Sequence, residues 1–286
     1  MTARVLTWAL AELQHRHRVA IATVLNTVGS VPGKTGARLA VSSRDDAWVG
    51  TVGGAGLERN VLDQCHIMLN QSAEPSAVVI TYGLNKGAKG YEVTPLDSLC
   101  GGRVTVSIEV MIPMPHLLIM GGGHCGEAIA TSAHQLEWSY SVHDSRAEYA
   151  SHHRYPHAVE ANSLSVSDFL ANETDQTLRR FSDILLLGHD WSEDQERLIG
   201  LLKIFHHPNT RFDGIQSPRI GVIGSRSKWL AFQKTCIEQG IVESMLEQVK
   251  CPIGLPIGAQ TPQEIAIAVV ADILACHKGK ANSVSA

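Results

Sequence analysis

A short glycine motif, Gly121-Gly122-Gly123-His124-Cys125-Gly126, constrains the fold of this chain more than any other feature. It has the pattern G-x-G-x-x-G at Gly121, Gly123 and Gly126, and it joins an apolar run at 117–120 to a helical pattern. In such a turn the first glycine bends the chain, the second lets the backbone approach a pyrophosphate, and the third lets the helix pack on the strand. The motif therefore predicts a Rossmann-like, doubly wound parallel sheet.

An acidic residue follows the motif at the spacing this fold uses. Asp144 stands at the end of the next expected strand, 139–143, about 20 residues on, where an acid would accept hydrogen bonds from a ribose. Arg146 leaves room for a 2′-phosphate in the same place. The pattern indicates NAD(P) as one possible ligand, although a fold alone does not fix a function.

Two further strands, 184–187 and 219–223, repeat the strand–helix pattern. Ligands of open α/β sheets bind at the carboxyl ends of the strands, so the residues after these strands are candidates. They are His189, Ser225 and Arg226. Ser225 could equally serve only as the N-cap of the helix that follows.

The last helix has a clear start, because Thr261, Pro262 and Glu264 form the pattern of a capping box. Gly240 is expected at the C′ position of the preceding long helix.

The chain divides by pattern into two domains. Its 286 residues exceed the usual size of one domain, roughly 100–200 residues. Two prolines in Met111-Ile112-Pro113-Met114-Pro115 interrupt regular structure where the pattern changes. We expect an N-terminal α+β domain at 1–112 and the Rossmann-like domain at 116–286.

The first domain carries glycine-rich strings of its own. Gly29 and Ser30 lie in one string, with Arg38 shortly after it, and Gly53 and Gly54 lie in a second. Bare main-chain amides near a helix start can hold an anion, and an arginine can add a forked donor. Tight turns would explain the same glycines equally well.

Cys100, in Cys100-Gly101-Gly102, is a thiol on an expected turn. It could be a soft metal ligand or a sulfur acceptor, or it could be chemically inert.

Composition limits the partners and the compartment. The net charge of −4 gives no electrostatic reason to expect nucleic acid or an anionic membrane surface. No apolar stretch reaches the ~18 residues of a membrane span. Residues 1–13 predict an amphipathic first helix, with Val5, Leu6, Ala9, Leu10 and Leu13 on one face. Six cysteines without a C-x-x-C pair favour reduced thiols in the cytoplasm.

These strings, in this order, resemble the XdhC/CoxI family of xanthine dehydrogenase accessory proteins. The resemblance covers nearly the whole chain. Its motifs are 27–32, 36–38, 50–54, Leu57-Glu58, 100–102, 121–126, 144–146, His189-Asp190, 224–226, 251–254, 257–259 and 261–266. The chain departs from the family pattern at Gly33-Lys34, Ala55 and Pro256.

The resemblance implies a chaperone of the molybdenum cofactor (molybdopterin). Such a protein binds the cofactor, protects it during sulfuration by a cysteine desulfurase, and delivers it to a xanthine dehydrogenase or a related molybdenum hydroxylase. Arg38 with the glycine amides would then hold the anionic part of the cofactor, and Cys100 would contact the molybdenum or receive sulfur. A homodimer is a further expectation, because a large cofactor must be shielded and handed over.

Two other functions stay open at this point. One is an NAD(P)-dependent oxidoreductase that uses the Rossmann domain, although the chain lacks a recognisable Tyr-x-x-x-Lys acid–base pair. The other is an interaction protein whose Rossmann domain holds no ligand and docks the target enzyme.

Overall fold

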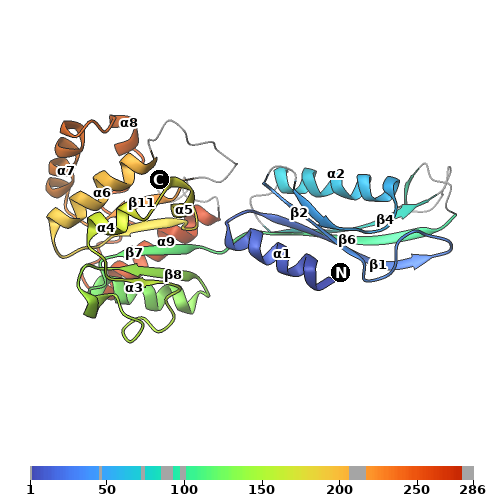
Figure 1. Cartoon of the computed structure of the whole chain (residues 1–286), viewed down its shortest axis with the longest axis horizontal. Helices are drawn as coiled ribbons and strands as arrows, with labels where there is room; N and C mark the ends of the chain where they lie inside the picture. The colour runs from blue at the N-terminus through green and yellow to red at the C-terminus, as the bar shows by residue number, and fades with distance from the viewer. Residues whose placement is uncertain are drawn as a thin grey trace. The chain divides into compact units, whose positions relative to one another are not determined.

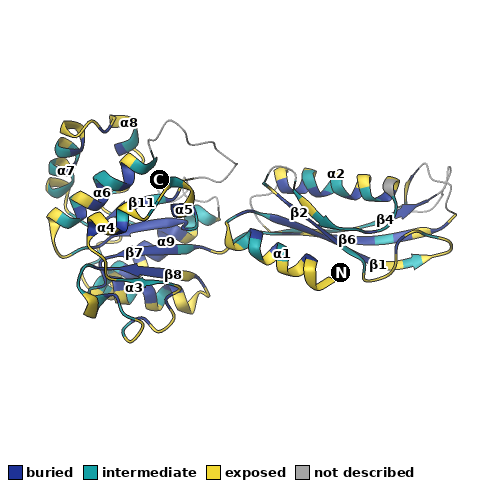
Figure 2. Ribbon diagram, viewed as in Figure 1, coloured by how far each residue is buried: buried dark blue, intermediate teal, exposed yellow. Residues whose placement is uncertain are grey.

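The computed structural model describes residues 2–44, 47–71, 75–84, 93–96, 101–205 and 217–278. Contacts divide the chain into two units, one ending at Pro113 and the other beginning at Met114 (Figure 1). Each unit has its own buried apolar core (Figure 2).

The described strands of the first unit form one sheet, in which the two central strands pair antiparallel. In order across the sheet they are β3 (Trp48–Gly50), β2 (Arg38–Ser42), β1 (Val19–Val28), β6 (Arg103–Met111), β4 (Ser76–Gly83) and β5 (Val93–Pro95). Neighbours pair antiparallel except β4 and β5, which are parallel. Buried and more exposed residues alternate along β6, as in a strand that packs one face on the core.

Alternate residues of β1 serve the two faces of this sheet, as the period of a strand requires. Ala20 and Ala22 pack with the helix α2 (Ala55–Gln71) through Leu57 and Val61. Val19 and Ile21 face the other way.

That second face is covered by α1 (Thr2–Gln14), the amphipathic helix expected at the N-terminus. Val5 and Ala9 are buried there, but Leu6 and Leu10 are 47% and 56% exposed. The predicted apolar face was therefore wrong at these two positions. The buried side of α1 includes Glu12 instead, whose carboxylate accepts a hydrogen bond from Ser42 Oγ at 2.7 Å.

The second unit is a parallel sheet with helices on both faces, which confirms the predicted fold class. Its described strands pair in the order β11 (Arg219–Val222), β10 (Asp183–Leu186), β7 (His116–Met120), β8 (Ser139–His143) and β9 (Ala161–Asn162). Its helices are α3 (His124–Gln135), the short η1 (Ala147–Tyr149), α4 (Val166–Ala171), α5 (Asp175–Leu178), α6 (Trp191–Phe205), α7 (Arg226–Glu238), α8 (Glu243–Leu246) and α9 (Pro262–His277).

The central strand β7 is buried on both sides. Leu117 and Ile119 pack with α3 and α9, whereas Leu118 and Met120 pack with α6 and α7 (Figure 1). This is why the run reads as continuously apolar. Since β7, β8, β10 and β11 are parallel, their carboxyl ends lie at one edge of the sheet.

The predicted helix ends are confirmed at α7 and α9. Thr261 and Glu264 form the capping box of α9, with Pro262 in the first turn. Gly240 follows α7 with a φ of +82°, the left-handed conformation expected at C′. Among the described helices, none has the length and apolar character that crossing a membrane requires.

Candidate functional site

In the glycine turn after β7, two positions, 121 and 126, must be glycine because a Cβ there would overlap the surrounding main chain. A Cβ on Gly121, whose φ is +124°, would lie 2.5 Å from the carbonyl carbon of Leu187. A Cβ on Gly126 would overlap the main-chain oxygen of Gly121. These two residues therefore let the turn close and let α3 pack on the sheet.

Gly123 differs, because no heavy atom lies within 4 Å of the place its Cβ would take. It is the N-cap of α3 and provides no side-chain cap. The helix begins at His124, directly after this glycine. The open backbone at Gly123 and the start of a 12-residue helix together suit an anion.

Gly122, which the motif leaves unspecified, is the most tightly held residue of the turn. Its N–H donates to Asp144 Oδ2 at 2.9 Å, and its carbonyl accepts from the Tyr155 hydroxyl at 2.8 Å. A Cβ on Gly122 would overlap the carbonyl oxygen of Tyr149. Sequence reasoning missed both tyrosines, because their contacts to the turn depend on how the segment after β8 folds back.

Asp144 is buried and accepts four hydrogen bonds. Besides the N–H of Gly122, its donors are the N–H, Nε and Nη2 of Arg146, at 3.0, 2.8 and 2.8 Å. Burial opposes ionisation, but the hydrogen bonds from Arg146 and Gly122 outweigh it and lower the pKa of Asp144 below its ordinary value. The structure thus joins Asp144 to the glycine turn as predicted, and its contact with a ribose stays a prediction.

Two guanidinium groups lie over the ring of Tyr149. The Cζ atom of Arg146 is 3.8 Å from the ring centroid, and that of Arg154 is 5.0 Å from it. Arg154 also pairs with Glu127 of α3 at 2.6 Å. The glycine turn is therefore bordered by two positive side chains that are each tied to a carboxylate.

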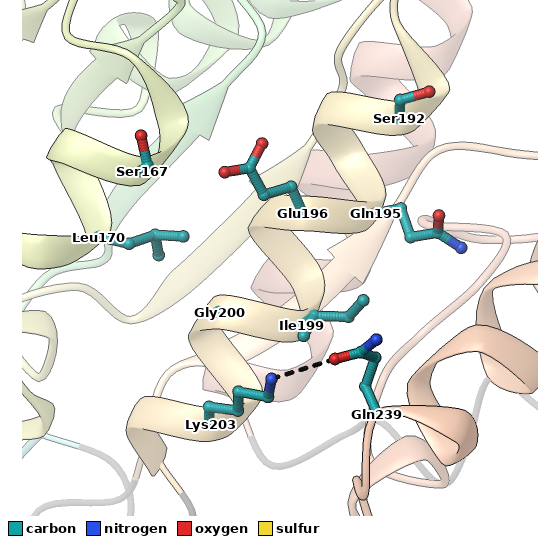
Figure 3. A pocket seen from close by; sticks show the side chains of 9 residues that line it. All are labelled: Ser167, Leu170, Ser192, Gln195, Glu196, Ile199, Gly200, Lys203 and Gln239. Atoms are coloured by element: carbon teal, nitrogen blue, oxygen red, sulfur yellow. Dashed lines mark hydrogen bonds between the residues drawn. The ribbon is translucent and has the colours of Figure 1, made fainter.

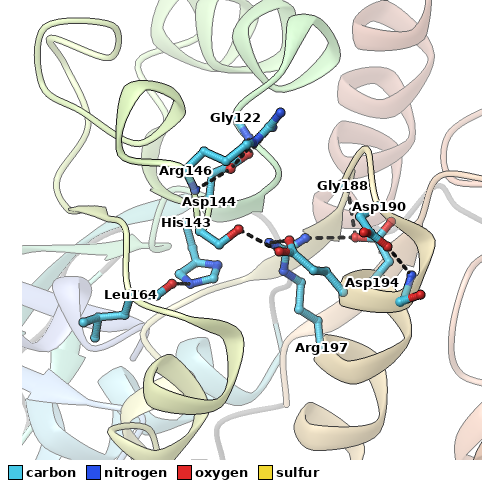
Figure 4. A network of polar contacts seen from close by, with 12 residues as sticks. Gly122, His143, Asp144, Arg146, Leu164, Gly188, Asp190, Asp194 and Arg197 are labelled. Carbon is cyan, nitrogen blue, oxygen red and sulfur yellow. Dashed lines mark hydrogen bonds and ion pairs between the residues drawn. The ribbon is translucent and has the colours of Figure 1, made fainter.

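A second polar network lies at the ends of β10 and β11 (Figure 4). Asp194 of α6 is fully buried, and its Oδ1 accepts from the N–H of Gly188 at 3.0 Å and from Arg197 Nη1 at 3.1 Å. Its Oδ2 accepts from Lys228 Nζ at 3.1 Å. The network fixes the turn that carries His189, which is itself exposed.

This network also reaches the segment that follows β8. Arg197, 1% exposed, also pairs with Glu193 at 3.0 Å, and Glu193 accepts from Ser145 Oγ at 2.7 Å. Sequence reasoning missed these residues. The available signal was the presence of Asp194 and Arg197 on a face of the helix that is otherwise apolar.

His143, at the end of β8, is buried beside this network. Its Nε2–H donates to the carbonyl of Leu164 at 3.1 Å, so the neutral ring carries its proton on Nε2. Nδ1 is buried without a hydrogen-bond partner in the described part of the chain. Burial and the charge of Arg197 lower the pKa of His143 to about 4.

Ser225 and Arg226 begin α7, as predicted. Ser225 Oγ accepts from the N–H of Lys228 at 3.3 Å, so this side chain caps the helix. Both residues are exposed.

In the first unit, three glycine-containing segments that are far apart in sequence lie close together: 29–33, 53–54 and 101–102. A Cβ on Gly53 would lie 2.6 Å from the N atom of Gly33, and one on Gly29 would lie 3.2 Å from the Cα of Gly102. Gly54 lies against the ring of Pro32. The two interpretations of these glycines, tight turns and an anion site, are thus compatible. Close packing of the strings also brings their main-chain amides into one region.

The other candidates of this unit are placed only in part. Ser30 is exposed, and Arg38 donates from Nε to Thr23 Oγ1 of the neighbouring strand at 3.2 Å. Cys100 lies outside the described residues, as does the side chain of Ala55. Thr51, which was not predicted, donates to the carboxylate of Glu58 and accepts from the N–H of Gly53 at 3.2 Å.

Within the described ranges, no cluster of three or more His, Cys, Asp or Glu side chains could hold a metal ion. The five cysteines in these ranges are free thiols.

A groove of about 480 Å³ runs along α6 between α4 and Gln239 (Figure 3). Leu170 and Ile199 give it apolar walls, and Lys203 Nζ donates to Gln239 Oε1 at 3.5 Å. None of the predicted site residues lines it.

The fold and the site define a two-domain α/β protein whose second domain is of the Rossmann type, with an acid–arginine pair beside its glycine turn. Residues 117–273 match the family described as the XdhC Rossmann domain, and residues 12–83 match the XdhC and CoxI family. The chain belongs to the XdhC and CoxI family, as its motifs indicated.

Two known proteins are similar to this chain. The uncharacterized protein YqeB of Escherichia coli (strain K12) is 30% identical over 255 residues, which are 89% of this chain and 43% of that protein. The chain therefore spans less than half the length of this curated relative. A crystal structure described as a xanthine dehydrogenase from Bacillus halodurans is similar over 98% of this chain and 96% of that chain, with 19% identity and a TM-score of 0.47.

Proposed function

We propose that this protein is an accessory factor for a molybdenum hydroxylase of the xanthine dehydrogenase type. It binds molybdenum cofactor, protects it during sulfuration by a cysteine desulfurase, and delivers it to the apoenzyme. Membership of the XdhC and CoxI family, matched in both units, is the observation that carries this proposal.

The residues present suit the anionic part of such a cofactor. Gly123 offers open backbone at the start of α3, and Arg146 places a guanidinium beside the same turn. In the first unit, we propose that the main-chain amides of the glycine strings hold an anion together with Arg38, whose Nε donates to Thr23. Molybdenum supplies the hydroxylation chemistry in the client enzyme, and the task of this chain is to hold and release the group.

The contacts of Tyr155 count against the oxidoreductase alternative. This tyrosine contacts the glycine turn, but its hydroxyl donates to the carbonyl of Gly122, and burial raises its pKa to about 12. It is therefore a poor proton donor for a carbonyl substrate.

The test is to purify the full chain without oxygen from a host that makes the cofactor. Molybdenum is measured by mass spectrometry, and pterin is measured by fluorescence after oxidation. We expect both to co-purify with the wild type and to be reduced in Arg38→Ala and Cys100→Ala. Arg59→Ala, at an exposed arginine of α2, is the matched control. Absence of molybdenum and pterin from the wild type would refute the proposal.

A further inference from the structure

The pair Asp144 and Arg146 lies where Rossmann folds recognise the ribose next to the glycine turn. In this position an acid accepts hydrogen bonds from the free hydroxyls of the ribose, whereas an arginine accommodates a 2′-phosphate. This chain has both residues, two positions apart. Their contacts show which of the two side chains is already fully hydrogen-bonded within the protein and which one can still bind a ligand.

Asp144 has no acceptor capacity left for a ribose. A carboxylate offers about four lone-pair sites, and those of Asp144 meet the four donors from Arg146 and Gly122. Three of these donors belong to a charged partner or its backbone. Ribose hydroxyls would have to displace that partner from a carboxylate that is 1% exposed.

Arg146 is held firmly but keeps a free side. Its Nε and Nη2 donate hydrogen bonds to Asp144. Its Cζ atom lies over the ring of Tyr149, 3.8 Å from the ring centroid. The side chain is nevertheless 31% exposed, and its Nη1 forms no hydrogen bond within the described ranges. A guanidinium held in this way needs little further ordering to bind an anion.

The segment that carries Arg146 is also fixed to the turn. The carbonyl of Tyr149 fills the space in which Gly122 would have a Cβ, and Tyr155 binds the carbonyl of Gly122. Arg154 adds a second positive group 5.0 Å from the ring centroid of Tyr149. The position of Arg146 relative to Gly123 is therefore built into the fold of the unit.

We propose that this pair makes the Rossmann unit selective for a nucleotide whose ribose carries a 2′-phosphate, as in NADPH, over the free diol of NADH. Asp144 is a positioning residue that orients the guanidinium, and Arg146 contacts the phosphate. This selectivity belongs to the second unit, and it does not rest on the proposed function.

The test is a titration of the purified full chain with NADPH and with NADH, followed by the fluorescence of the reduced nicotinamide. We expect NADPH to bind about tenfold tighter or more, as a charge-assisted phosphate contact implies. Arg146→Ala should weaken NADPH until the two nucleotides bind alike. 2′,5′-ADP should displace NADPH at concentrations at which 5′-AMP does not.

Arg219→Ala is the matched control, because this arginine pairs with Asp183 at the opposite edge of the sheet. It should leave the preference for NADPH unchanged. If Arg146→Ala fails to fold, Arg146→Lys should keep part of the preference through its charge. Equal binding of NADH and NADPH, binding of neither, or a preference that survives Arg146→Ala would overturn the proposal.

Discussion

The N–H of Gly122 donates a hydrogen bond to the carboxylate of Asp144 at 2.9 Å and thereby joins the glycine turn after β7 to the end of β8. Gly122 is an unspecified position in the pattern G-x-G-x-x-G, yet two side chains and one carbonyl close around it. The contacts of Gly122 therefore require a glycine at a position where the motif allows any residue.

Gly122→Ala should destabilise the second unit. The added methyl group would overlap the carbonyl oxygen of Tyr149, and a backbone atom cannot move aside as a flexible side chain can. We expect a loss of about 2 kcal/mol or more, within the range for overpacked sites. Urea denaturation followed by tryptophan fluorescence measures it, and wild-type stability would contradict the contact.

Gly123→Ser should keep the stability of the second unit but weaken nucleotide binding. The space beside Gly123 is open, and serine is a better N-cap than glycine, so stability should stay the same or rise by about 0.5 kcal/mol. The new side chain would stand where a ligand approaches, so nucleotide binding should weaken. A variant that is destabilised but binds normally would show that Gly123 is structural.

The two neighbouring glycines also mark the limit of what the sequence predicts. The turn, the acid at 144 and the cap at Thr261 follow local rules, and the structure confirms their positions. The overlap of Gly122 with Tyr149 depends on how the segment after β8 folds back, which no spacing rule describes. Asp194 and Lys228 likewise meet only because α6 and α7 pack on the same face of the sheet.

In the first unit, Gly53→Ala should be destabilising. Gly53 has a φ of +134°, and a Cβ there would lie 2.6 Å from the N atom of Gly33. Strain and overlap together should lower stability by about 2 kcal/mol. Gly56→Ala is the matched control, because this helical position is open and alanine should stabilise α2 by about 0.5–1 kcal/mol. Thermal unfolding of both variants measures these changes in stability. Equal changes in the two variants would argue against close packing of Gly53 on Gly33.

Asp194→Ala should cost about 3–5 kcal/mol, because it removes the buried partner of Arg197 and leaves this arginine only the more exposed Glu193. Lys228→Met should cost less, since Asp194 keeps Arg197 and the N–H of Gly188. Denaturant titrations of the two variants give the comparison. The order would be reversed if Lys228, and not Arg197, supplied the main compensation for the buried carboxylate.

His143 should make the protein less stable as the pH falls from 7 to 5. Burial, together with Arg197, lowers its pKa from 6.5 to about 4 in the folded state, whereas the nearby Asp144 and Glu193 act in the other direction. Between these two values the unfolded chain binds a proton that the folded chain does not, so acidification favours unfolding. The loss from this residue should reach about 2 kcal/mol at pH 5, because each pKa unit corresponds to ~1.4 kcal/mol.

The measurement is the free energy of unfolding at pH 7 and pH 5 for the wild type, His143→Gln and His153→Gln. Glutamine at 143 can still donate to the carbonyl of Leu164 but cannot be protonated, so this variant should lose about 2 kcal/mol less than the wild type on acidification. His153 is exposed, and its variant should follow the wild type. Asp144 also has a lowered pKa, but its contribution is lost only below the ordinary range of a carboxyl, at more acidic pH. The same pH dependence in all three proteins would show that His143 is not held neutral by its surroundings.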